Sequence, residues 1–75
     1  GETPSSAIRK AEEKDRVVRA LARLPDEYQM AIRLRTWDGL TFAAVGQVLD
    51  RSEDAARMLW ARAIERLKHE LRRQP

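Results

Sequence analysis

The last third of the chain holds the side chains best suited to chemistry with a partner molecule. Residues 51–75 contain seven basic and four acidic side chains, whereas residues 1–50 contain eight of each, so this segment carries the whole net charge of +3. Guanidinium groups bind phosphates and donate paired hydrogen bonds to guanine. The asymmetry therefore indicates a polyanionic partner such as nucleic acid. The arginines concerned include Arg51, Arg57, Arg62 and Arg66.

Catalytic and metal-binding groups are scarce. The chain has no cysteine and one histidine, His69, on the polar face of a predicted helix near its C-terminal end, where a solvated imidazole is favourable. Without a second histidine or a glycine-rich loop, no metal site, nucleophile–base pair or phosphate cradle can be assembled. The acidic pairs at 12–13 and 26–27 are explained as surface and helix-start residues. We therefore expect no enzyme, no metal, no cofactor and no small-molecule substrate.

Composition bounds the architecture. Seventy-five residues make one small domain, and 43% hydrophobic content with few glycines and prolines is typical of a folded helical protein. The longest apolar stretch is about seven residues, far short of the roughly 20 that span a membrane, and no signal peptide is visible. A cytoplasmic protein is expected. The missing initiator methionine predicts a fragment of a longer protein, with residues 1–5 as a linker and residues 6–75 as the domain.

Two helices are predicted in the first half of the chain. Residues 6–24 form the first, capped by Ser5 or Ser6. The second begins at Pro25, since proline suits a first helical turn, and it ends before Gly39, which is expected in the left-handed conformation. The sparse apolar stripe of the first helix comprises Ile8, Val17, Leu21 and Leu24.

A helix-turn-helix is predicted in the second half. Thr41 caps a helix over residues 42–49, and Ser52 caps a long helix that runs to about residue 73. Gly46 lies inside the shorter helix, and we attribute it to the close approach of another helix. No strand-like alternation occurs, so the fold class is an all-α, compact four-helix domain.

The long helix is amphipathic. On a 3.6-residue wheel its polar face carries Met58, Ala61, Arg62 and Arg66 among others. Trp60 falls on the apolar face and is therefore predicted to lie in the core, whereas Trp37 is left open between the core and an exposed partner contact. The apolar face comprises Ala56, Trp60, Ala63, Ile64, Leu67 and Leu71.

DNA binding is the function that this arrangement favours. A helix docked in a groove must offer donors from its N-terminal half, and flanking basic groups must neutralise phosphates. Ser52, Arg57, Arg62 and Arg66 are placed to do this, with Arg51 in the turn. An ordinary helical bundle with a basic solvated face explains the same residues, so the pattern alone leaves both possibilities open.

The stretch from Leu21 to Leu71 resembles the C-terminal domain, region 4, of bacterial extracytoplasmic-function (ECF) sigma factors. With the few residues before it, the match extends over roughly residues 17–71, and it consists of several ordered elements at consistent spacing. These elements are Leu24 to Tyr28, Ile32 to Arg35, Gly39 to Phe42, Val45 to Ala56, and Arg62-Ala63 with Leu67.

The resemblance implies promoter recognition. In the family, region 4 docks its recognition helix in the major groove of the −35 element, and its other side holds the flap of the RNA polymerase β subunit. Anti-sigma proteins often cover the same surfaces. Arg57 and Arg62 match basic positions that face DNA, and Met58 and Ala61 match positions that approach base edges. Ser52 matches a position near the DNA backbone, and Arg66 is assigned to phosphate or solvent.

The chain departs from the family pattern near the turn. Asp50 stands where glycine is common, and Asp54 where a small residue is usual. An acidic Asp54 repels phosphate unless it serves as a helix-start residue or accepts from a cytosine amine.

Two other functions compete with promoter recognition. One is a sigma-like helical module that binds polymerase or an anti-sigma protein, which Trp37, Met58, Leu59 and Ala61 favour. The other is the output domain of a two-component regulator, which the Leu-Pro-acidic-acidic-Tyr opening disfavours.

Overall fold

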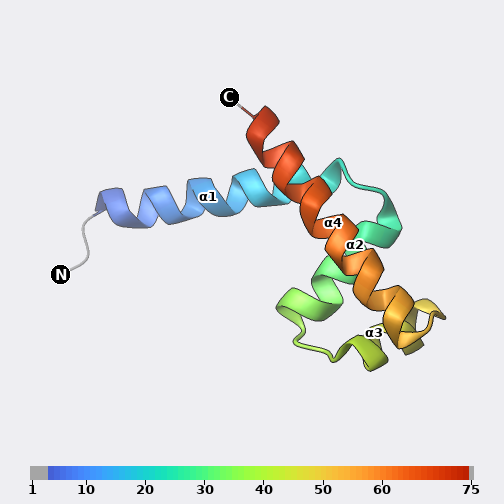
Figure 1. Ribbon diagram of the computed structural model, residues 1–75. Coiled ribbons are helices and arrows are strands. Elements are labelled where there is room, and N and C mark those ends of the chain that lie inside the picture. Colours follow the sequence, from blue (N-terminus) through green and yellow to red (C-terminus); the bar gives the residue numbers. More distant parts are fainter. Residues whose placement is uncertain (1–3, 75) are drawn as a thin grey trace.

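The computed structural model describes the backbone of residues 4–74 and the side chains of residues 9–74. No strand occurs between residues 4 and 74, and the predicted all-α fold with a helix-turn-helix is confirmed (Figure 1). The elements in chain order are α1 (Pro4–Ala22), α2 (Asp26–Ile32), the short π-helix η1 (Arg33–Trp37), α3 (Phe42–Leu49) and α4 (Glu53–Arg73).

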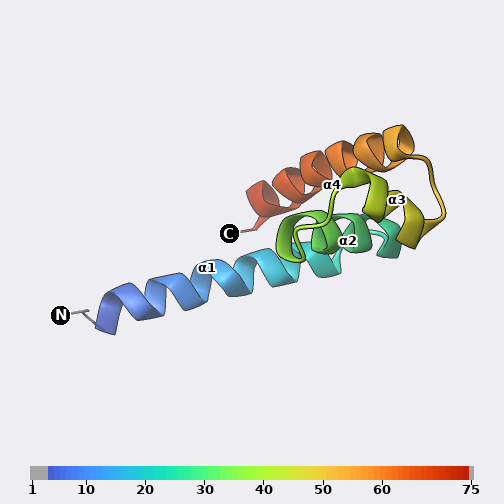
Figure 2. The same cartoon turned by 90° about the horizontal axis from the view of Figure 1, so that it is seen from below.

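Helix α4 is the element against which α1, α2 and α3 all pack (Figures 1 and 2). Two groups of buried side chains meet along it, one with α1 and α2 and one with η1 and α3. Ala56 and Ala63 face these groups from α4 and are fully buried. Their small side chains let the neighbouring helices approach closely, and each large apolar residue buried there contributes roughly 1.5–3 kcal/mol. The two groups are Leu21, Leu24, Ile32 and Ala63, and Leu34, Val45 and Ala56.

Only the second half of α1 belongs to this core. Residues 9–16 are exposed, and the N-terminal part of the helix extends away from the rest of the molecule (Figure 2). The helix begins at Pro4, before the predicted start, and ends at Ala22, before the predicted end at Leu24. It ends early because a residue preceding a proline, here Pro25, is disfavoured in helical geometry. Leu24 is buried nonetheless, whereas the side chain of Ile8 lies outside the described residues.

The second predicted helix changes its winding partway. It is an α-helix to Ile32 and then a π-helix, in which the Asp38 N–H donates to the Arg33 carbonyl at 2.9 Å. A π-helix turn inserts one extra residue, and hydrophobic spacing over five residues does not distinguish it from an α-helix. The chain then turns at Gly39, whose φ of 70° confirms the predicted left-handed conformation.

Both predicted caps of the helix-turn-helix are confirmed. The Thr41 hydroxyl accepts from the Ala44 N–H, and the Ser52 hydroxyl accepts from the Ala55 N–H, each at 3.1 Å. Between the helices, Asp50 takes the left-handed conformation with φ 57°. Aspartate tolerates this geometry better than most residues, which explains how it stands where the family commonly has glycine.

The predicted reason for Gly46 is wrong. A Cβ at this position would collide with the carbonyl oxygen of Arg51 and lie 3.1 Å from that of Ser52. The close neighbour is thus the backbone of the motif's own turn and not another helix. The Arg51 N–H donates to the Gly46 carbonyl at 2.7 Å, which holds the turn in this position.

One residue of α4 is more buried than predicted and one is less. Leu59, expected to favour an exposed interaction surface, is buried, and Glu70, for which the pattern made no prediction, is buried too, at 3% exposure. Trp60 is half-buried instead of lying wholly in the core. A large indole needs a partner for its N–H, and here the Trp60 Nε1–H donates to the Thr36 hydroxyl at 3.3 Å while the ring packs edge-on against Phe42.

We predict that Gly46→Ala destabilises the domain by about 1–3 kcal/mol, the usual cost of overpacking, because the turn backbone must move to admit the methyl group. Chemical denaturation followed by circular dichroism measures this. Gln47→Ala, on the exposed side of the same helix, is the matched control and should change stability by no more than about 0.5 kcal/mol. Equal midpoints for the two variants would show that the turn is not tightly packed.

Candidate nucleic-acid interface

The helix-turn-helix leaves the outer face of α4 open to solvent. All seven side chains that the sequence assigns to DNA contact are exposed. They do not form one cluster. Arg51, Met58 and Arg62 line one hollow beside α2, whereas Arg57 lies against Phe42 of α3 and Arg66 lies one turn beyond Arg62. These residues are Arg51, Ser52, Arg57, Met58, Ala61, Arg62 and Arg66.

Arg57 is held on the α3 side of the helix. Its guanidinium makes an ion pair with Asp54 at 2.9 Å and a longer one with Glu53 at 3.6 Å. The same group lies 5.2 Å from the centre of the Phe42 ring, and Arg35 lies 4.4 Å from that centre. Exposed pairs of this kind add only a few tenths of a kcal/mol, so their effect is to orient Arg57 and not to stabilise the fold.

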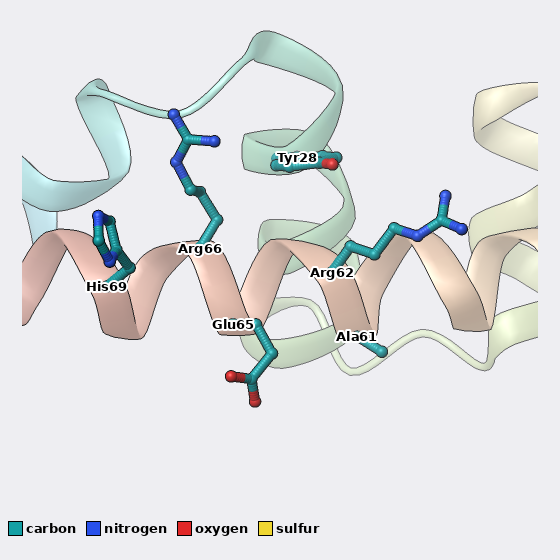
Figure 3. Close-up of a pocket in the computed structure, with 6 residues that line it drawn as sticks. All are labelled: Tyr28, Ala61, Arg62, Glu65, Arg66 and His69. Atoms are coloured by element: carbon teal, nitrogen blue, oxygen red, sulfur yellow. The ribbon is translucent and has the colours of Figure 1, made fainter.

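Arg62 is placed on the opposite flank. It makes no ion pair within the described part of the chain, and it lines an open hollow between α4 and α2. In Figure 3, Arg62 and Arg66 project toward the side where Tyr28 lies, whereas Ala61 and Glu65 project away from it. The guanidinium of Arg62 is therefore available to an incoming anion.

Arg51 and Arg66 are both tied to carboxylates. Arg51, in the turn, pairs with Glu27 of α2. Arg66 lies 3.7 Å from the Glu70 carboxylate, which also has Arg23 at 4.0 Å and Arg73 at 3.8 Å. Glu70 thereby links the end of α1 to the last turns of α4. Its Oε2 has no hydrogen-bond partner among the described residues, and no pattern in the sequence indicates that this acid is buried.

The acids of the first turn of α4 have two effects. Glu53 and Asp54 lie at the positive end of the helix dipole, which favours negative side chains there. The structure thus supports the helix-start role that was one alternative for Asp54. Both acids also pair with Arg57, so its guanidinium offers less free positive charge to a partner than a solvated arginine would.

A second surface lies between α1 and η1. Val18 and Trp37 are exposed to 54% and 55%, and together with Val17 and Leu21 they line an apolar groove with Lys14 and Arg33 at its edges. Of the two positions that the sequence left open for Trp37, in the core or on the surface, the structure shows the surface. Sequence reasoning missed the groove because it depends on how η1 packs beside α1.

Other kinds of site find little support among residues 9–74. No group of three or more histidine, cysteine, aspartate or glutamate side chains is arranged to hold a metal ion there. His69 is exposed in the hollow beside Arg66. No helix among the described residues is long and apolar enough to cross a membrane.

The fold and the exposed basic helix define a protein of the helix-turn-helix class. Comparison with family models is more specific: the model described as Sigma-70, region 4 matches residues 20–69, which is two thirds of the chain. The chain therefore belongs to the sigma-70 region 4 family, a DNA-binding family of the transcription machinery and not a family of enzymes. Comparison with curated proteins gave no match, and comparison with solved structures gave none.

We predict that Asp54→Asn raises the affinity for duplex DNA at low salt about three- to tenfold, because it removes a charge that repels phosphate and releases Arg57 from its closest ion pair. Fluorescence anisotropy with a labelled duplex measures the change. Asp15→Asn, on the exposed part of α1, removes the same charge far from α4 and is the control. If the two variants bind alike, Asp54 does not oppose DNA.

Proposed function

We propose that this domain recognises the −35 element of promoters by placing the N-terminal half of α4 in the major groove. The observation that carries the proposal is the form of this half-helix. It is capped by Ser52, exposed along its outer face, and bordered by Arg57 on one flank and Arg62 on the other. A helix of this width fits the major groove, where basic flanks meet the phosphates on both sides.

We further propose that the domain is part of an ECF-type sigma factor and works at the nucleoid in the bacterial cytoplasm. The Leu24 to Tyr28 opening and the Arg62-Ala63 step support this subtype. Membership of the family implies contact with DNA and with RNA polymerase in general.

For the polymerase contact we propose the groove between α1 and η1 as the surface that receives the β-subunit flap. Its exposed Val18 and Trp37 offer apolar area, and Lys14 and Arg33 at its rim favour a partner with acidic side chains. The groove does not include α4, so DNA and polymerase need not compete for one surface. An anti-sigma protein that covered either surface would block the corresponding contact.

One observation favours the alternative of a helical module that binds only proteins. The outermost positions of α4 near its start, Asp54, Met58 and Ala61, present no side-chain hydrogen-bond donor. Under this alternative, polymerase or an anti-sigma protein binds as above, while duplex DNA binds with no sequence preference.

We predict that Arg62→Ala weakens binding to a duplex selected from a random pool about tenfold. It should also lower the slope of log affinity against log salt concentration by about one, the value for one lost phosphate contact. Arg57→Ala should have a smaller effect, because its charge is already partly neutralised. Anisotropy titrations at several salt concentrations measure both. Arg9→Ala, on the exposed part of α1, is the control. If no sequence preference emerges from the pool and the variants bind as the wild type does, promoter recognition by α4 is wrong.

For the polymerase surface we predict that Val18→Ser weakens binding to the isolated β flap at least fivefold, because it places a hydroxyl in the apolar groove. Val48→Ser on α3 is closely matched, since the two valines are exposed to 54% and 55%. Calorimetry with the purified flap measures both. Equal affinities for the two variants would exclude this groove as the flap site.

A further inference from the structure

Four exposed positions lie along the outermost line of α4, at the spacing of one helix face, and we call them the crest. They are Asp54, Met58, Ala61 and Glu65. None carries a side-chain hydrogen-bond donor, since two are carboxylates and two are apolar. This composition is unusual for the part of a helix proposed to face DNA.

The two arginines nearest to the crest stand on its sides. At about 100° per residue, Arg57 and Arg62 are roughly 140° apart around the helix. The guanidinium of Arg57 pairs with Asp54 at the start of the crest, and it lies on the α3 side, 5.2 Å from the centre of the Phe42 ring. Arg62 projects toward α2 on the side where Tyr28 lies, whereas Ala61 does not (Figure 3).

We propose that Arg57 and Arg62 bind phosphates on opposite walls of the major groove, and that Met58 and Ala61 recognise the C5 methyl group of thymine. This inference rests on the proposed function and specifies which chemistry the helix reads. It assigns the arginines to affinity and the apolar crest to sequence discrimination.

The argument for thymine follows from what each base displays. Guanine shows two acceptors in the major groove and needs a donor such as arginine, which the crest lacks. Thymine displays a methyl group, which an apolar side chain can cover. Met58 is 54% exposed and its flexible thioether adapts to such a group, while Ala61 is small enough to let the helix come close to the base edges.

Arg57 is poorly prepared to read guanine directly. A bidentate contact requires two of its N–H groups, and the structure directs Nη1 to Asp54 and Nη2 to Glu53. A phosphate can be met by a remaining N–H without dissolving both pairs, since guanidinium carries five donors. The held geometry therefore favours a backbone contact on the α3 side.

The test uses the duplex selected by the wild-type domain from a random pool. Each thymine of that duplex is replaced singly by deoxyuridine, which removes only the methyl group. We expect one or two positions at which the wild-type domain binds about fourfold more weakly, the value for one buried methyl group. The Met58→Ala variant should bind the thymine and deoxyuridine duplexes with about equal affinity at one of those positions. Met30→Ala, an exposed methionine on α2, is the matched control and should retain the full penalty.

Three results overturn the inference. The first is specific binding that is indifferent to every deoxyuridine, and the second is a penalty that persists unchanged in Met58→Ala. The third is a guanine preference that disappears in Arg57→Ala, which would make Arg57 a base reader. In each case binding remains sequence-specific, so the proposed function survives. A pool that yields no sequence preference overturns both the inference and the proposed function.

Discussion

Helix α3 meets the turn before α4 at Gly46, where the chain leaves no room for a side chain. This contact, closed by the hydrogen bond from the Arg51 N–H to the Gly46 carbonyl and by the left-handed Asp50, sets the direction in which α4 leaves the turn. The course of α4 in turn decides which of its faces meets α1, α2 and α3 and which remains open. Because α1, α2 and α3 all pack on α4, the core and the candidate interface both depend on this one backbone contact.

Ion pairs determine how much free positive charge α4 and the turn before it present, more than the number of basic residues does. The sequence places an excess of basic residues in the last third, but most of the arginines there are held by carboxylates. Arg57 is oriented by Glu53 and Asp54, while Arg62 makes no ion pair among the described residues. In the proposed complex with DNA, such a surface would supply moderate electrostatic attraction and leave discrimination to shape and apolar contact.

Local chemistry made much of the fold predictable. The caps Thr41 and Ser52 and the helices that follow them depend on residues within one turn, and the structure has them where the sequence predicts. What depends on packing between distant segments was not predictable. The burial of Glu70 and the contact of Arg57 with Phe42 belong to this group. The π-helix at residues 33–37 was missed for another reason, because hydrophobic spacing over five residues does not distinguish it from an α-helix. The exposure of the candidate site residues could be anticipated from periodicity, but the carboxylates that hold several of them could not.

The proposed function requires the N-terminal half of α4 to enter the DNA. Nuclear magnetic resonance of the labelled domain, titrated with its selected duplex, tests this most directly because every backbone amide except those of the prolines reports separately. We expect the largest chemical-shift changes at residues 52–62 and unchanged amide shifts for Val18 and Trp37 in the groove between α1 and η1. Changes concentrated on that groove, with residues 52–62 unaffected, would contradict the proposed function.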